Sequence, residues 1–167
     1  MRGYWWVNQT DQHILERRKE IVAGRKSEST HWSRTNVSKM EIGDLIICYR
    51  SGIGIDRLAF VNKKIGICPA REVWDHAEDE GEAYVAGVEY FFIKKDNIVR
   101  KENFSSKMKK FAGMPRGPIL RNGNIRYGYA MKFEENGFDD IQNIVKNSQP
   151  ELECWLQKIG FLQNKKE

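Results

Sequence analysis

The segment Gly3-Tyr4-Trp5-Trp6-Val7-Asn8-Gln9-Thr10 near the start of the chain constrains the fold more than any other. Bulky aromatic and β-branched residues in succession favour a β-strand, and successive side chains of a strand point to opposite faces. We therefore predict a central strand over residues 3–9 whose two faces differ. Tyr4, Trp6 and Asn8 share one face, and Trp5 and Val7 share the other. Asn8 marks the polar end, so we expect Trp6 to lie nearer to a pocket than Trp5.

A third tryptophan follows in His31-Trp32-Ser33-Arg34-Thr35-Asn36. Flat rings beside amide and hydroxyl groups can hold a planar base, because rings stack on its faces while polar groups bind its edge. The alternative is that the tryptophans fill a small core, which is the commoner use of any single one. The hypothesis of a base-binding site therefore rests on the whole constellation.

Length and composition limit the class of protein. A chain of 167 residues is long enough for one domain with a real core. It contains no apolar run long enough to span a bilayer, and its start does not look like a secretory leader. The cysteines are odd in number and far apart, so we expect small buried thiols and a reduced, cytoplasmic location. They are Cys48, Cys68 and Cys154.

The net charge of +5 is modest, but its distribution is uneven. Ten Lys or Arg residues stand between residues 94 and 126, opposed only by Asp96 and Glu102. A concentrated basic face attracts phosphate backbones, although an unevenly charged solvated surface would have the same composition. Residues 113–126 interleave arginines with Gly, Pro and Asn. We predict phosphate contacts from three of these arginines, with an ordinary polar loop as the alternative: Arg116, Arg121 and Arg126.

Periodicity and turn signals predict a mixture of helices and strands. We expect a helix over residues 12–23, capped by Asp11 and ended by Gly24. Further strands are expected over residues 45–50, 65–74, 84–93 and 126–133, and further helices over 104–112, over 138–146 and after Pro150. These elements make an α+β fold with a small β-barrel. We predict a main domain over residues 1–147 and a C-terminal helix and tail over 148–167.

Catalytic signals are weak. The three histidines have no metal-ligand neighbours at a usual spacing, and no serine stands on a nucleophile elbow. We expect neither a metal nor a cofactor. The acidic group of Asp75, Glu78 and Asp79 could bind a cation, although a solvated turn explains it better.

Several short motifs, taken in order, resemble the EVE domain, a member of the PUA-like superfamily related to YTH and ASCH domains. They are Trp5-Trp6-Val7-Asn8-Gln9, then residues 31–37, the turn Gly43-Asp44, Ile47-Cys48-Tyr49 and Val88-Glu89-Tyr90-Phe91. The resemblance covers about residues 3–145. It implies a β-barrel of about five to six strands flanked by helices, and binding of modified bases in nucleic acids. It also suggests a role as the specificity module of a McrBC-type restriction system, fused to or associated with a nuclease or ATPase.

The resemblance also implies roles for individual residues. Trp32-Ser33 is similar to the pair that YTH domains use in a cage for N6-methyladenine, and Asn8 stands where that relative reads the base edge. Tyr49 and Trp74 are further candidates for walls of the pocket. We therefore expect a non-enzymatic reader of a modified base (methylated adenine or modified cytosine) that is flipped into an aromatic pocket, with DNA favoured over RNA as the nucleic acid. Two alternatives stay open: a small metal-dependent nuclease or hydrolase, and a protein-interaction module without a base pocket.

Overall fold

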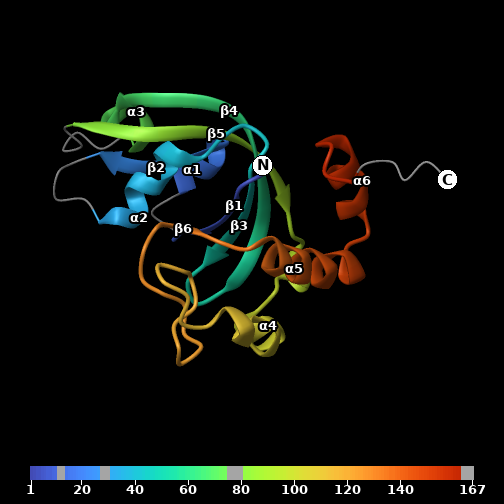
Figure 1. The fold of residues 1–167 in the computed structure, drawn as a ribbon. Coiled ribbons are helices and arrows are strands. Elements are labelled where there is room, and N and C mark those ends of the chain that lie inside the picture. Colours follow the sequence, from blue (N-terminus) through green and yellow to red (C-terminus); the bar gives the residue numbers. More distant parts are fainter. Residues whose placement is uncertain (11–13, 27–30, 75–80, 163–167) are drawn as a thin grey trace.

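The computed structural model describes residues 1–10, 14–26, 31–74 and 81–162, and its framework is a six-stranded sheet (Figure 1). The strand order is β2-β5-β4-β3-β1-β6. Only β1 and β3 pair in parallel, and every other neighbouring pair is antiparallel. The sheet curls into a half-barrel, so the predicted α+β class is confirmed. The strands are β1 (Tyr4–Asn8), β2 (Ile21–Lys26), β3 (Leu45–Arg50), β4 (Gly54–Pro69), β5 (Glu82–Phe92) and β6 (Ala130–Lys132).

The two faces of β1 differ as the alternation predicts. Tyr4 and Trp6 belong to one buried cluster, and Trp5 and Val7 belong to another. Both indoles are buried, Trp6 with no exposed surface at all. Trp6 is therefore a core residue, although its indole nitrogen reaches the polar end of the strand, as described below.

A short helical segment fills the space between the two edges of the half-barrel. It consists of α2 (Trp32–Thr35) and the 3-10 helix η2 (Asn36–Lys39), and it contacts both β2 and β6. The Asn36 side chain donates a hydrogen bond to the carbonyl oxygen of Ala130 at 2.9 Å. On the other side, a Cβ atom at Gly24 would lie 2.1 Å from the carbonyl oxygen of Arg34, so only glycine allows the close approach.

The helices that follow β5 cover the opposite side of the sheet from α1 (Ile14–Arg18) and α2 (Figure 1). The longest, α5, buries Phe138, Ile141 and Val145, whose spacing places them on one helical face. Leu152 and Trp155 of α6 enter the same cluster as Trp6. None of the described helices is long and apolar enough to cross a membrane. The covering elements are η3 (Lys95–Asn97), α4 (Lys101–Met108), η4 (Lys109–Phe111), α5 (Glu135–Ser148) and α6 (Glu151–Lys158).

The predicted helix over residues 12–23 is wrong over its second half. The helix α1 spans only Ile14–Arg18, and Ile21–Lys26 forms β2, paired with β5. Glu20 adopts a positive φ of 52°, which ends the helix between the two elements. Ile21 and Val22 suit a strand as well as a helix, and the free edge of β5 decides between them. Asp11, the expected cap, lies outside the described residues.

Two strand predictions need new boundaries. The strand expected over residues 65–74 begins much earlier, at Gly54, and ends at Pro69, after which α3 (Ala70–Trp74) follows. The strand expected over 126–133 shortens to β6. Before it, the carbonyl oxygens of Arg126 and Gly128 accept from the Asn8 side chain instead of joining the regular pairing with β1. By contrast, β3 has the predicted bounds, α5 includes the predicted range, and β5 begins two residues before the predicted range and ends one residue before its end. Cys48 is buried as expected, whereas Cys154 is exposed.

Candidate functional site

The side chain of Asn8 joins the end of β1 to the loop before β6. Its amide nitrogen donates to the carbonyl oxygens of Arg126 at 3.0 Å and Gly128 at 2.6 Å. Its amide oxygen accepts from the indole nitrogen of Trp6 at 2.8 Å. Both hydrogens of the amide are thereby used within the protein. Asn8 fixes this loop against the strand, and only one lone pair of its oxygen stays free of these bonds.

Ser33 at the start of α2 holds the same loop from the other side. Its hydroxyl oxygen accepts from the backbone nitrogen of Tyr129 at 2.8 Å and lies 2.8 Å from Nδ1 of His31. Nδ1 of His31 also accepts from the backbone nitrogen of Ser33 at 3.3 Å. A Cβ atom at Gly128 would lie 3.0 Å from the Ser33 hydroxyl oxygen, so glycine is needed there. Ser33 itself is fully buried.

The half-buried ring of Trp32 lies above this framework. It packs against the cluster that contains Trp6, and its ring centroid lies 5.1 Å from that of His31. The guanidinium carbon of Arg116 lies 5.5 Å from the Trp32 ring centroid, in cation–π contact. The Trp32 ring is therefore an aromatic platform, and the flat guanidinium of Arg116 lies on it.

The backbone around Arg116 fits this contact. Gly117 donates to the carbonyl oxygen of Met114 at 3.0 Å, which closes a four-residue turn with Pro115 and Arg116 in its centre. Arg116 has a positive φ of 55°. Proline at the second position and positive φ at the third are features of a type II turn. The turn places an exposed arginine beside Trp32.

Tyr127 lies at the rim of this site and was missed by the sequence analysis. It stands between the two residues whose carbonyl oxygens bind Asn8, and it is 87% exposed. An exposed ring on a loop fixed from two sides suits ligand contact. The signal that could have identified Tyr127 is a tyrosine inside a Gly- and Asn-rich loop. His31 was missed as well, and its position directly before Trp32 was the signal.

Tyr49 and Trp74 lie apart from this platform. The Tyr49 ring packs inside the core, with its centroid 5.4 Å from that of Trp6. Trp74 ends α3 and packs against a different cluster, with its indole nitrogen bonded to the Glu16 carboxylate at 2.9 Å. The structure thus brings Trp32, Ser33, Asn8 and Trp6 together, with Tyr49 behind them, and leaves Trp74 elsewhere.

The three arginines of the loop differ in their surroundings. Arg116 is exposed over Trp32, and Arg121 is exposed with its side chain against Gly113. Arg126 is half-buried and donates from Nε to the carbonyl oxygen of Gly117 at 2.7 Å, which ties the two parts of the loop together. Elsewhere in the basic segment, Lys94 and Lys110 are paired with acids.

A buried carboxyl group supports the site from within the half-barrel. Glu16 accepts hydrogen bonds from the Tyr129 hydroxyl and from Gln9 Nε2, in addition to Trp74. Burial raises the pKa of Glu16 to about 7, against the lowering effect of these bonds. Tyr129 also binds Ser33 through its backbone, so Glu16 and the platform share one residue.

No group of three or more His, Cys, Asp or Glu residues within the described ranges is placed to hold a metal ion. The acidic residues Asp75, Glu78 and Asp79 lie outside those ranges.

Comparisons with known proteins find likeness in structure but not in sequence. No protein-family model matches the chain, and no curated protein matches it. A hypothetical protein from Leishmania major superposes with a TM-score of 0.58 at 13% identity, over 89% of this chain and 98% of that one. The DUF55 domain of human thymocyte nuclear protein 1 superposes with a TM-score of 0.54 at 12% identity, over 86% of this chain and 99% of that one.

A mutant of the ZmASCH protein from Zymomonas mobilis gives a TM-score of 0.52 at 9% identity, over 86% of this chain and 96% of that one. The human protein, THYN1, has also been solved in complex with 5-methylcytosine-containing DNA, with a TM-score of 0.45 at 13% identity over 83% of this chain and 95% of that one. The resemblance to EVE and ASCH domains is confirmed as a likeness of fold, whereas the link to McrBC-type systems stays a prediction. The chain has the PUA-like fold that EVE (DUF55) and ASCH domains share.

Proposed function

We propose that this chain is a non-enzymatic reader of a modified base in nucleic acid, in DNA more than RNA. The base would leave its stack and bind on Trp32. The observation that carries the proposal is the guanidinium of Arg116 lying 5.5 Å from the centroid of the half-buried Trp32 ring. A guanidinium and a nucleobase are both flat groups that stack on indole, so a ring that holds one can hold the other.

In this proposal the Arg116 guanidinium occupies the Trp32 ring only while no base is bound. Arg116 is exposed, and within the described part of the chain it makes no ion pair. A base stacking on Trp32 would displace the guanidinium, which could then bind the adjacent phosphate. Tyr127 would supply a second ring. Burying one methyl group of a modified base adds on the order of 0.8 kcal/mol, and aromatic contact adds about 0.5–1.5 kcal/mol.

Asn8 and Ser33 take a different role from the one that the family resemblance implies. The Asn8 amide already donates to the loop around Gly128, and the Ser33 hydroxyl oxygen accepts from the backbone of Tyr129, so we assign both residues to positioning that loop. The remaining lone pair of the Asn8 amide oxygen is the group left for the base edge. Burial of the Ser33 hydroxyl also argues against a serine nucleophile, which supports a binding function without catalysis.

The test is binding of matched oligonucleotides to the wild-type chain and to Trp32→Ala. The complex of THYN1 makes 5-methylcytosine DNA the first probe, beside N6-methyladenine DNA, unmodified DNA and the same sequences as RNA. Loss of a stacking ring costs about 1–3 kcal/mol, roughly a 5- to 150-fold rise in Kd. We expect Trp32→Ala to lose this affinity for the preferred oligonucleotide while weak, salt-sensitive binding persists.

Trp74→Ala is the matched control, because it removes another half-buried indole that packs against a different cluster. It also removes a hydrogen bond to Glu16, whose effect on the platform should fall on all bases alike, so the preference among bases should be kept. Circular dichroism must show that both variants fold. A folded Trp32→Ala protein that ranks the modified bases as the wild type does would refute the assignment of Trp32.

A further inference from the structure

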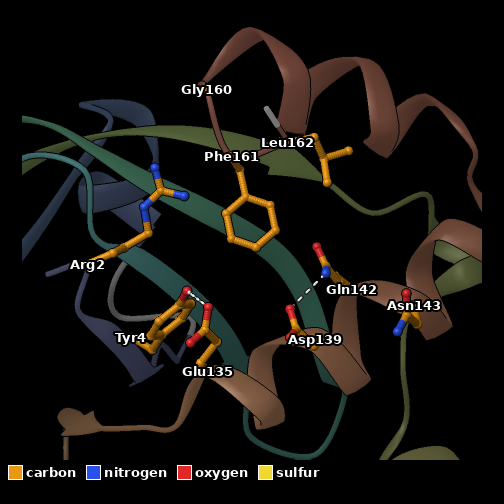
Figure 2. Close-up of a pocket in the computed structure, with 9 residues that line it drawn as sticks. All are labelled: Arg2, Tyr4, Glu135, Asp139, Gln142, Asn143, Gly160, Phe161 and Leu162. Carbon is orange, nitrogen blue, oxygen red and sulfur yellow. Dashed lines mark hydrogen bonds between the residues drawn. The ribbon is translucent and has the colours of Figure 1, made fainter. Parts of the chain in front are cut away.

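A pocket lies at the end of β1 opposite to the Trp32 platform. It is bounded by the start of that strand, one side of α5 and the segment after α6. Its volume is about 700 Å³, within the range of small-molecule sites. Figure 2 shows Arg2 and Phe161 on one side of it and Glu135 and Asp139 on the other. The lining residues are Arg2, Tyr4, Glu135, Asp139, Gln142, Asn143, Gly160, Phe161 and Leu162.

The pocket carries charges of both signs on different walls. The Arg2 guanidinium lies 5.2 Å from the centroid of the Phe161 ring. Glu135 accepts from the Tyr4 hydroxyl at 2.8 Å, and Asp139 accepts from Gln142 at 2.9 Å. Within the described part of the chain, neither Arg2 nor either carboxylate has an ion-pair partner. Glu135 is exposed and Arg2 and Asp139 are half-buried, so the three charged groups line one solvent-accessible pocket.

The pKa of Tyr4 is affected by positive and negative charges, so groups of both signs lie near this side chain. Burial raises the pKa of Tyr4 to about 12, and the bond and charge of Glu135 add to this effect. The Arg2 charge acts in the opposite direction, and the Asp139 charge raises the pKa further. The pKa of Asp139 is itself raised, first by burial and then by the negative charges of Glu135 and Asp140. A cation bound beside Asp139 would relieve that repulsion.

A third observation concerns hydrogen-bond acceptors. Among the described residues, the buried side-chain oxygen of Gln142 has no hydrogen-bond partner, and the amide nitrogen donates to Asp139. An ammonium group carries three donors, so it could bind the Asp139 carboxylate and, if the Gln142 amide rotates to expose its oxygen, that oxygen as well. Phe161 and Leu162 add an apolar wall beside these polar groups (Figure 2).

We propose that this pocket binds a zwitterionic small molecule of the α-amino-acid class with an apolar side chain. The Arg2 guanidinium would bind the ligand carboxylate, for which its planar fork is suited. Asp139, with Glu135 and Gln142, would bind the ammonium group, and Phe161 would contact the side chain. This site is independent of the Trp32 platform, so neither proposal depends on the other.

The test is an NMR titration of the isotope-labelled full chain with free phenylalanine, its methyl ester and its N-acetyl derivative. The ester lacks the carboxylate and the acetyl derivative lacks the ammonium group. We expect free phenylalanine to shift the side-chain amide signals of Gln142 and Asn143 in a saturable manner. Both derivatives should bind about tenfold more weakly, since each lacks one charge-assisted contact.

Two variants assign the two charged walls separately. Asp139→Asn should lose the preference for phenylalanine over the acetyl derivative, and Arg2→Ala should lose the preference over the methyl ester. Glu41→Gln is the matched control, because it removes an exposed carboxylate that is paired with Lys64 elsewhere. It should leave all three affinities unchanged, and none of the variants should alter oligonucleotide binding. Absence of a saturable shift, or equal binding of all three compounds, would overturn the proposal.

Discussion

The two ends of β1 carry polar side chains that are used in opposite ways. At the Asn8 end, the amide and hydroxyl groups bind one another and the loop before β6, and flat groups lie exposed above them. At the Tyr4 end, Arg2 and Asp139 line one pocket. The same five-residue strand thus ends in a tightly bonded platform on one side and, on the other, in charged groups that have no ion-pair partner within the described part of the chain.

This difference separates residues that position a site from residues that bind ligand. Asn8 donates to the loop before β6 and Ser33 accepts from it, so both set the shape of the loop, and under the proposed function Trp32, Arg116 and Tyr127 are the residues that would contact a base. In the pocket of Figure 2, by contrast, the charged groups themselves are available. Occupied hydrogen bonds therefore indicate a structural role even where residue type suggests recognition.

The largest predicted difference between the two ends is a pH dependence of the free energy of unfolding, which we assign to Glu16 at the platform end. The folded pKa of Glu16, about 7, exceeds its ordinary value of 4.5, so between these values the native state holds a proton that the unfolded chain releases. The free energy of unfolding should then fall as pH rises through this window, by about 3 kcal/mol in all. Urea denaturation at pH 4.5, 6 and 7.5 measures it.

Glu16→Gln should flatten this dependence, because the amide oxygen can still accept from the Tyr129 hydroxyl without titrating. Asp139→Asn is the control at the other end of β1. Asp139 is partly exposed, so its removal should change the slope far less. An Asp139→Asn protein that loses the pH dependence while Glu16→Gln keeps it would reverse the assignment.

A matched pair of substitutions compares the two ends of the strand directly. Asn8→Ala leaves the fully buried indole N–H of Trp6 without its acceptor, at about 1–3 kcal/mol, and releases the loop carbonyls as well. Tyr4→Phe removes one hydrogen bond to Glu135 at the pocket, at about 0.5–1.5 kcal/mol. Urea denaturation should therefore find Asn8→Ala the less stable protein.

The same pair also tests the positioning role in binding. Loosening the loop should weaken binding of all bases alike, whereas loss of an edge contact would fall on the preferred base alone. A base-selective loss in Asn8→Ala would return the amide to the edge-reading role that the family resemblance implies.

The local sequence determined much of the fold but not the choice of strand partners. The run Leu45–Arg50 is apolar and β-branched, and its strand has the predicted bounds. Residues 21–26 fit a helix or a strand equally well, and only the long β5 beside them, which is distant in sequence, makes them a strand. Glu20 ends the helix because its backbone has a positive φ, and the pattern of side chains does not predict this conformation.

The candidate site was predictable where neighbours in sequence are neighbours in space. His31, Trp32 and Ser33 act together in one turn of chain, and Asn8 is close to Trp6 on one face. Trp74 could not be excluded from the sequence, because its distance from Trp32 depends on how α3 packs. Nor could the sequence show that the amide of Asn8 is occupied, since its partners lie 118 and 120 residues away.

The smallest predicted effect concerns the arginines of the loop and tests whether phosphate contacts belong to the platform end. Arg121 is exposed, and Arg121→Ala should weaken all oligonucleotides alike and reduce the slope of log Kd against log salt by about one unit. Arg126 is half-buried and bonded to the carbonyl oxygen of Gly117, so Arg126→Ala should lower stability as well.

Lys94→Ala is the control, because Lys94 is paired with Glu151 and its replacement should leave the slope unchanged. Anisotropy titrations at 50, 100 and 200 mM salt, about a fourfold range, separate these cases. If Lys94→Ala changed the slope while Arg121→Ala left it intact, the phosphate contacts would lie near the start of α6, and the loop before β6 would lose the role assigned to it.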